Sequence, residues 1–214
     1  MAAKVKICGL MRPEDAAFAA RAGASYLGVV FAGGPRAVTE QQAGEIVIAG
    51  GGVPVLGVFA DQNVDAILQI RDQAGLSGAQ LHGPYSGLDA ERLRRAGLLV
   101  WRVVRIAAPA DLDVVGRAML ASDAVLIEPL IPTALGGAGV PLEVAVAREA
   151  RGRLPGHPMA LAGGLTPETV AKAIAIVRPE IVDVSSGVED RPGIKNHTKM
   201  LRFVEAAFAH SSIA

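Results

Sequence analysis

The sequence has a single cysteine, Cys8, among its 214 residues. One cysteine excludes an internal disulfide and a metal cluster held by several thiolates. The four histidines are scattered and include no HExxH motif, so the pattern predicts no metal site. No GxGxxG motif follows the first expected strand, so we also expect no dinucleotide cofactor.

The sequence also lacks an excess of charge of either sign. Lys plus Arg and Asp plus Glu number 21 each, so no global field would attract nucleic acid or an anionic membrane surface. We expect no signal peptide, because "MAAKVKICGL" has no long apolar core. Every apolar run stops before the about 18 residues that predict a membrane span. These absences, with one free thiol, predict a cytoplasmic protein that binds neither nucleic acid nor membrane.

Aromatic residues are scarce at 4%, whereas 51% of the chain is hydrophobic. A core of Ala, Val, Leu and Ile is typical of α/β proteins, in which many small elements pack closely. The length suits one good core, and the sequence shows no linker or low-complexity segment. We therefore expect a single domain over residues 1–214.

Short β-branched runs alternate with Ala-rich helical stretches along the whole chain. The expected strands are 4–9, 25–31, 53–60, 78–82, 98–105, 123–128, 158–163 and 181–186. The expected helices are 13–22, 39–49, 63–74, 87–96, 109–118, 141–151, 167–177 and 196–209. Pro13 suits a first helical turn, and Thr39 and Thr166 suit N-caps.

Strands that alternate with helices in this way predict a parallel sheet. Near-continuous apolar strands such as "VLGVF" indicate a sheet covered on both faces. A doubly wound sheet is the alternative, but eight repeats favour closure. The predicted fold is therefore α/β: a single (β/α)₈ TIM barrel with a parallel eight-stranded sheet.

Glycine-rich segments follow three late strands, where a barrel carries its chemistry. They are "LGGAG" (135–139), "AGGL" (162–165) and "SSGVE" (185–189). Any one pair of glycines could be a simple turn. Three such loops at the end where barrels frequently bind phosphate indicate an anion site, because glycine lets backbone N–H groups approach one point.

Cys8 and Glu128 stand at the ends of the first and sixth expected strands. A lone cysteine is usually a small hydrophobe, and a loop glutamate is usually solvated. At the mouth of a barrel, however, a thiol can act as a base when a positive neighbour stabilises the thiolate. A partly buried carboxyl can act as the acid. With a phosphate anchor, this pair indicates an isomerase or lyase that acts on a sugar phosphate.

Several motifs together resemble one family. They are "KICGL", "RPEDA", "LGVVF", "PRAVT", "QLHG", "LAGGLTPETV" and "DVSSGVE" with "PGIKNH". This set, spread over about residues 4–206, is similar to phosphoribosylanthranilate isomerase of tryptophan biosynthesis. The resemblance implies a cofactor-free Amadori rearrangement of N-(5-phosphoribosyl)anthranilate to 1-(2-carboxyphenylamino)-1-deoxyribulose 5-phosphate.

The resemblance also implies roles for individual residues. Cys8 would be the general base, and Glu128 would stand where the family has an acidic aspartate. Arg36 would pair with the anthranilate carboxylate, Asp183 would orient the sugar hydroxyls or the amine, and His82 would line the pocket. The expected phosphate ligands are Gly137, Gly139, Gly163, Gly164, Ser186 and Gly187.

Three departures from the family pattern leave alternatives open. Glu128 is one methylene longer than aspartate, "AGG" precedes "PR", and "VPLEVAV" replaces the usual Phe-Asp-Trp stretch. The alternatives are another phosphate-binding barrel, either a related sugar-phosphate isomerase or an indole-forming synthase, and a non-catalytic binder of phosphate ligands. The expected partner is a small phosphorylated substrate, and the protein is expected to be a monomer or a homodimer.

Overall fold

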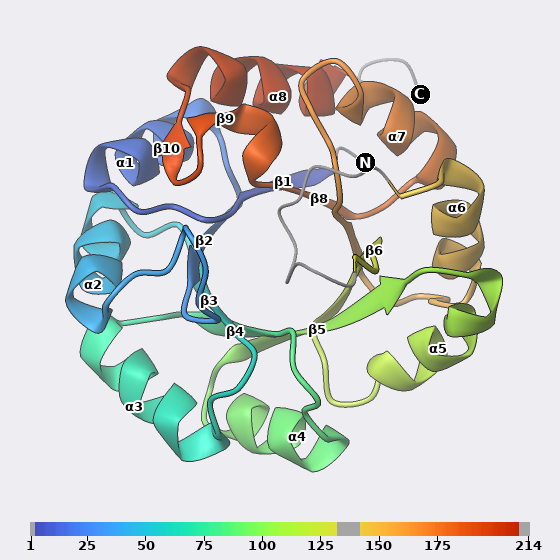
Figure 1. The fold of residues 1–214 in the computed structure, drawn as a ribbon, viewed down its shortest axis with the longest axis horizontal. Coiled ribbons are helices and arrows are strands. Elements are labelled where there is room, and N and C mark those ends of the chain that lie inside the picture. Colours follow the sequence, from blue (N-terminus) through green and yellow to red (C-terminus); the bar gives the residue numbers. More distant parts are fainter. Residues whose placement is uncertain (1–2, 132–141, 210–214) are drawn as a thin grey trace.

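The computed structural model describes residues 3–131 and 142–209. Eight parallel strands close into a barrel in chain order, and β8 pairs with β1 to complete it (Figure 1). The barrel strands are β1 (Lys4–Ile7), β2 (Tyr26–Val30), β3 (Val55–Phe59), β4 (Gly78–Leu81), β5 (Leu99–Ile106), β6 (Ala124–Pro129), β7 (Met159–Leu161) and β8 (Ile181–Val184). The predicted eight-stranded barrel is therefore confirmed.

Helices form a ring around the barrel (Figure 1). The α-helices are α1 (Pro13–Ala22), α2 (Glu40–Ala49), α3 (Val64–Ala74), α4 (Gly87–Arg95), α5 (Val115–Ala118), α6 (Val144–Gly152), α7 (Val170–Val177) and α8 (His197–Ala209). Two 3₁₀ helices, η1 (Pro109–Val114) and η2 (Ser186–Val188), and a small hairpin of β9 (Glu189–Arg191) and β10 (Ile194–Lys195) complete the described elements. Among these residues, no helix combines the length and the apolar character needed to cross a membrane.

Most predicted boundaries agree with the structure, and two predictions were wrong. Thr39 caps α2 in a capping box with Gln42, as expected. The expected helix over 109–118 is mainly the 3₁₀ helix η1, followed by a single turn of α-helix. Thr166 does not cap α7, because its carbonyl oxygen and hydroxyl instead close a turn over 166–170, and α7 begins at Val170.

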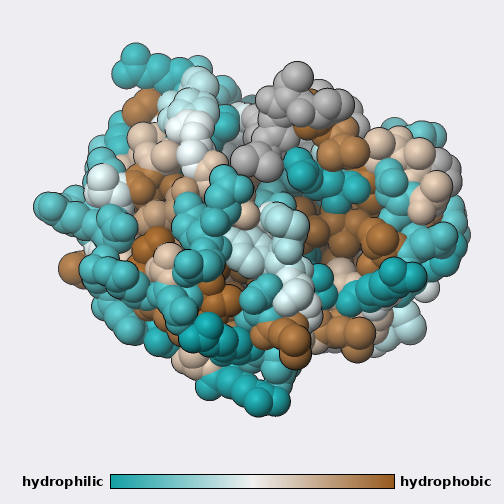
Figure 2. All heavy atoms as spheres, turned by 60° about the horizontal axis from the view of Figure 1, so that its bottom comes forward, coloured by the Kyte–Doolittle hydropathy of each residue, from teal (hydrophilic) through white to brown (hydrophobic). Residues whose placement is uncertain are grey.

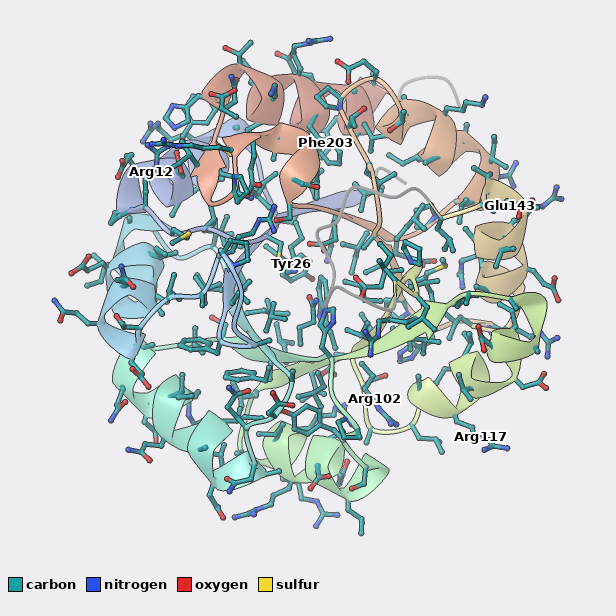
Figure 3. All side chains as sticks on the ribbon, in the orientation of Figure 1. Arg12, Tyr26, Arg102, Arg117, Glu143 and Phe203 are labelled. Atoms are coloured by element: carbon teal, nitrogen blue, oxygen red, sulfur yellow. The ribbon has the colours of Figure 1, made fainter. Side chains whose placement is uncertain are left out.

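Apolar side chains form two separate layers. The larger layer lies between the sheet and the helices. The smaller one fills the barrel interior and consists of Leu56, Trp101, Ala124, Leu126, Ala160, Ala162 and Ile181. Tyr26 packs against this interior cluster with its ring edge-on to Trp101, and Figure 3 shows it near the middle of the barrel. The barrel is therefore a filled core and not a pore.

Alternation along the strands sets which polar residues point inward. Trp101, Leu126 and Ile181 belong to the interior cluster. Glu128 lies two residues after Leu126 on β6, and Asp183 lies two residues after Ile181 on β8, so both face the barrel interior. The register pairs Lys6 of β1 with Asp183 of β8. A layer of polar groups therefore lies above the apolar interior, toward the C-terminal ends of the strands.

The outer surface shows no dominant character on the face drawn in Figure 2. Hydrophilic residues cover much of this face, and apolar residues lie between them in separate patches.

Candidate active site

A buried lysine, Lys6, lies at the centre of the polar layer. Its ammonium is fully buried and donates to Asp183 Oδ1 and to Gln80 Oε1, each at 2.8 Å. The Trp101 ring lies beside it, with 5.5 Å between Nζ and the ring centroid. Burial is the largest single influence and lowers the pKa of Lys6, but the Asp183 carboxylate and Cys8 together outweigh it and the pKa is raised overall. Lys6 is therefore a fixed positive charge inside the barrel.

Cys8 lies beside Lys6 at the mouth of the barrel. Its backbone N–H donates to the carbonyl oxygen of Val184 at 2.8 Å, which extends the pairing of β1 with β8. A β-carbon on Gly28 would lie 2.7 Å from Cys8 Sγ and 3.1 Å from Lys6 Cε, so both side chains occupy the space that this glycine leaves. Gly28 thus makes room for the thiol.

The charge state of Cys8 reflects opposing influences. Burial raises the pKa of the thiol, Lys6 opposes this, and Asp183 adds to the increase. The net direction is upward, so Cys8 is a neutral thiol in this state of the site. Lys6 is the positive neighbour that a thiolate at this position needs.

Glu128 lies at the end of β6 with only 6% of its surface exposed. Its Oε1 atom is 3.5 Å from His82 Nδ1, and Oε1 makes no hydrogen bond to the described residues. Burial and the Asp183 carboxylate raise the pKa of Glu128 to about 7, against the opposing effect of Arg105 and Lys6. A carboxyl with this pKa keeps its proton in much of the population at neutral pH, as a general acid requires.

This raised pKa predicts a pH-dependent loss of stability. The unfolded chain releases the Glu128 proton near pH 4.5, whereas the folded chain releases it only near pH 7. The free energy of unfolding therefore decreases as the pH rises from 4.5 to 7, and above pH 7 the full cost of about 3 kcal/mol applies. Glu128→Gln should remove that cost. Thermal melts at pH 5 and pH 8 should show that the stability of the variant, relative to that of the parent, increases with pH. A pH-independent difference between the two proteins would contradict the assignment.

Arg36 is held by a second buried ion-pair network. Its Nε and Nη2 atoms donate to the two carboxylate oxygens of Glu189, at 2.9 and 2.7 Å. Lys195 Nζ donates to the same carboxylate at 2.7 Å and to the carbonyl oxygen of Ser185 at 3.2 Å. This pairing leaves both Nη1 hydrogens and one Nη2 hydrogen of Arg36 without a partner among the described residues. A flat anion could meet that free edge.

The loops after β7 and β8 lie against each other. Gly163 and Gly164 have φ angles of 95° and 63°, which glycine adopts without strain. A β-carbon on Gly187 would overlap the carbonyl oxygen of Leu165, so only glycine permits this approach. Four of the six expected phosphate ligands, Gly163, Gly164, Ser186 and Gly187, are on these two neighbouring loops. Gly137 and Gly139 lie outside the described residues.

A cavity of about 680 Å³ opens beside β5 and α5, and its lining includes none of Lys6, Cys8, Glu128 and Asp183. His82 is part of its lining, together with three arginines: Arg102, Arg105 and Arg117. Figure 3 shows Arg102 and Arg117 on the side of β5 and α5. Within residues 3–131 and 142–209, no three His, Cys, Asp or Glu side chains are grouped to hold a metal ion.

Several residues of this site were not predicted from the sequence. They are Lys6, Gln80, Glu189 and Lys195. A signal existed for the first two: Lys6 precedes Cys8 by two residues and Gln80 precedes His82 by two, so strand alternation places each pair on one face. The pairing of Glu189 with Arg36 has no such signal, because 153 residues separate them.

Comparison with known proteins places the chain in a family. A family model described as N-(5'-phosphoribosyl)anthranilate (PRA) isomerase matches residues 5–206. The N-(5'-phosphoribosyl)anthranilate isomerase of Roseiflexus castenholzii is 40% identical over 217 residues, which cover 96% of this chain and 98% of the relative.

Solved structures give the same result. A monomeric form of the dimeric Thermotoga maritima phosphoribosylanthranilate isomerase superposes with a TM-score of 0.85 at 30% identity, covering 96% of this chain and 98% of that one. A complex of such an isomerase with reduced 1-(o-carboxyphenylamino)-1-deoxyribulose 5-phosphate gives a TM-score of 0.84 at 29% identity, with the same coverage. From the nearly full-length family match and these relatives, the chain belongs to the N-(5'-phosphoribosyl)anthranilate isomerase family.

Proposed function

We propose that Cys8 and Glu128 are the general base and the general acid of this isomerase. The chain converts N-(5'-phosphoribosyl)anthranilate into 1-(2-carboxyphenylamino)-1-deoxyribulose 5-phosphate, an Amadori rearrangement in tryptophan biosynthesis. The observation that carries the assignment is that the charges of the same buried pair, Lys6 and Asp183, act on the pKa of both residues. Each can therefore reach one sugar ring held at the C-terminal end of the barrel.

In the first step, Glu128 donates its proton to the furanose ring oxygen. The bond between C1 and that oxygen breaks, and the nitrogen lone pair forms the C1=N bond of an iminium. Cys8 first loses its proton to solvent to become the thiolate beside Lys6; the thiolate then removes the C2 proton, and the electron pair forms an enolamine. Proton transfer to C1 and loss of the C2 hydroxyl proton give the ketone, so the atoms of substrate and product balance.

Three further roles complete the proposal. The free edge of Arg36 would bind the anthranilate carboxylate, since a guanidinium fork suits a planar anion. Asp183, fixed by Lys6 at 2.8 Å, would orient the amine or the sugar hydroxyls. The glycine loops that carry Gly163, Gly164, Ser186 and Gly187 would bind the phosphate, with Gly137 and Gly139 as proposed ligands from the segment outside the described residues.

Arg36→Ala should raise KM with a smaller effect on kcat. The carboxylate interaction is present in both the ground state and the transition state, so its loss weakens binding of both. Loss of a hydrogen bond between two charged groups weakens substrate binding enough to raise KM by about 10-fold or more. Steady-state kinetics on Arg36→Ala and Arg36→Lys would check this, with the lysine variant between the alanine variant and the parent. An unchanged KM in Arg36→Ala would remove the role.

The activity itself can be tested by following the fluorescence of phosphoribosylanthranilate as it is consumed. Turnover by the parent chain supports the proposal. Binding of the reduced product analogue without turnover would instead favour a non-catalytic phosphate-ligand binder.

Two expectations about the protein in its setting follow. Cys8 must stay reduced to act as a base, which suits a reducing compartment such as the cytoplasm. We propose a monomer or a homodimer, and a dimeric form is known for the Thermotoga maritima relative. Sedimentation equilibrium would decide between the two states.

A further inference from the structure

We propose that His82 is a positioning residue for Glu128, and that Lys6, acting through Gln80, fixes the imidazole in the tautomer that carries its proton on Nδ1. This inference rests on the proposed role of Glu128 as the acid. It adds a function for two buried side chains that the reaction steps above do not use, Gln80 and His82, and a further function for Lys6.

The first step is the orientation of the Gln80 amide. Lys6 Nζ has only hydrogens to offer, so the Gln80 atom 2.8 Å from it must be the oxygen. The amide nitrogen is then the atom 2.8 Å from His82 Nε2. Because Lys6 is a fixed buried donor, the amide cannot be turned the other way without placing two donors against each other.

The second step is the tautomer of His82. The Gln80 amide nitrogen donates, so His82 Nε2 must accept and carries no proton. The proton of the neutral ring is therefore on Nδ1, which lies 3.5 Å from Glu128 Oε1. An imidazolium would place an N–H against the amide N–H of Gln80. In agreement, burial, Lys6 and Arg105 lower the pKa of His82 to about 3.

The third step is the consequence for the acid. With Oε1 facing the Nδ1–H of His82, the proton of Glu128 belongs on the other oxygen, Oε2, which is then the oxygen that donates to the substrate. In the opposite tautomer, the bare Nδ1 would accept this proton and withhold it from the sugar. The 3.5 Å separation is longer than a usual N–H···O hydrogen bond, and we expect it to shorten when substrate fills the mouth.

The charged groups around this pair come from three other strands. Lys6 of β1 and Arg105 of β5 act on both residues, and Asp183 of β8 acts on Glu128. The segment 132–141 carries no charged residue in the sequence. Of these neighbours, only Lys6 is linked to His82 through a hydrogen-bonded side chain, so Lys6 is the group that sets the tautomer.

The tautomer can be measured directly in the full-length protein labelled with ¹⁵N-histidine. We expect the His82 signals at pH 7 to show a protonated Nδ1 and an unprotonated Nε2, with His82→Asn used to assign them. Gln80→Glu replaces the donor by an acceptor and should move the proton to Nε2 or add a second one. A proton on Nε2 of His82 in the parent chain would overturn the proposal.

Kinetics test the positioning role. His82→Leu should lower kcat by about 10- to 100-fold with little change in KM, since a small displacement of a catalytic group has costs of this size. His82→Asn keeps an amide donor near the position of Nδ1 and should recover most of that loss, whereas His82→Gln, whose amide reaches toward Nε2, should not. His157→Asn, at a histidine that instead contacts Ser122, is the matched control and should leave kcat unchanged.

The outcomes separate this inference from the proposed function. A parent chain without turnover would contradict the function, and the tautomer would still be read by NMR. An active parent with equal kcat in His82→Leu would overturn the positioning role. So would equal losses in His82→Leu and His82→Asn, because retention of the donor would then have no effect.

Discussion

Glu128→Gln should lower kcat by about 10²- to 10⁴-fold while the affinity for the reduced product analogue stays close to that of the parent. The amide keeps the size and the hydrogen-bonding reach of the carboxyl but has no acidic proton to give. General acid catalysis by a positioned group contributes a factor of this order. Since the proton is transferred only as the ring opens, its loss affects the transition state more than ground-state binding.

Glu128→Asp is the matched control, because it keeps the acid and shortens the side chain by one methylene. The shorter carboxyl would retreat from His82 and from the mouth, so we expect a smaller loss than in the glutamine variant. Single-turnover kinetics would report the chemical step for both variants. A glutamine variant as active as the parent would show that another group supplies the proton, and Asp183 would be the first to examine.

Cys8→Ala should abolish measurable turnover by removing the base, again by about 10²- to 10⁴-fold in kcat. Cys8→Ser should be nearly as inactive, because a hydroxyl is a far weaker acid than a thiol and is not ionised beside Lys6. Binding of the reduced product analogue should survive in both variants, since the proposed carboxylate and phosphate contacts are elsewhere. Analogue binding is therefore the control that separates lost chemistry from lost folding.

Because Cys8 is the only cysteine, alkylation by a thiol reagent reports on this one side chain. Because burial raises the pKa of Cys8, the alkylation rate of the protein without ligand should be low at pH 8 and should increase at higher pH. Lys6→Met should slow alkylation further, because it removes the positive neighbour of the thiolate. An alkylation rate with a midpoint below about 8.5, the value for an ordinary thiol, would contradict the described environment of Cys8.

Local signals in the sequence were enough to predict most of the fold. The helix over 13–22 begins at Pro13 and is followed by Gly23 in a left-handed conformation, so its ends follow from local chemistry. The segment over 109–118 differs, because Asp111 accepts hydrogen bonds from the N–H groups of Ala107 and Ala108 and fixes a tight first turn. That competition between turn types is not visible in the hydrophobic pattern.

The sequence predicted only part of the site, and the reason differs from that for the fold. Strand ends pointed to Cys8, His82, Glu128 and Asp183, which do share one end of the barrel. The partners that set their charge come from distant parts of the chain, since Lys6 is 177 residues from Asp183 and 74 from Gln80. A buried lysine is rare, and only closure of β8 onto β1 supplies the carboxylate that makes it tolerable.

The central claim is that an acid and a base from β6 and β1 act on one sugar between them. A crystal structure of this protein with reduced 1-(o-carboxyphenylamino)-1-deoxyribulose 5-phosphate tests it most directly. The account predicts Glu128 Oε2 at about 2.6–3.2 Å from the C4 hydroxyl oxygen, which was the ring oxygen of the substrate, and Cys8 Sγ in contact with C2. A ligand whose C2 and C4 atoms lie beyond the reach of these two side chains would contradict it.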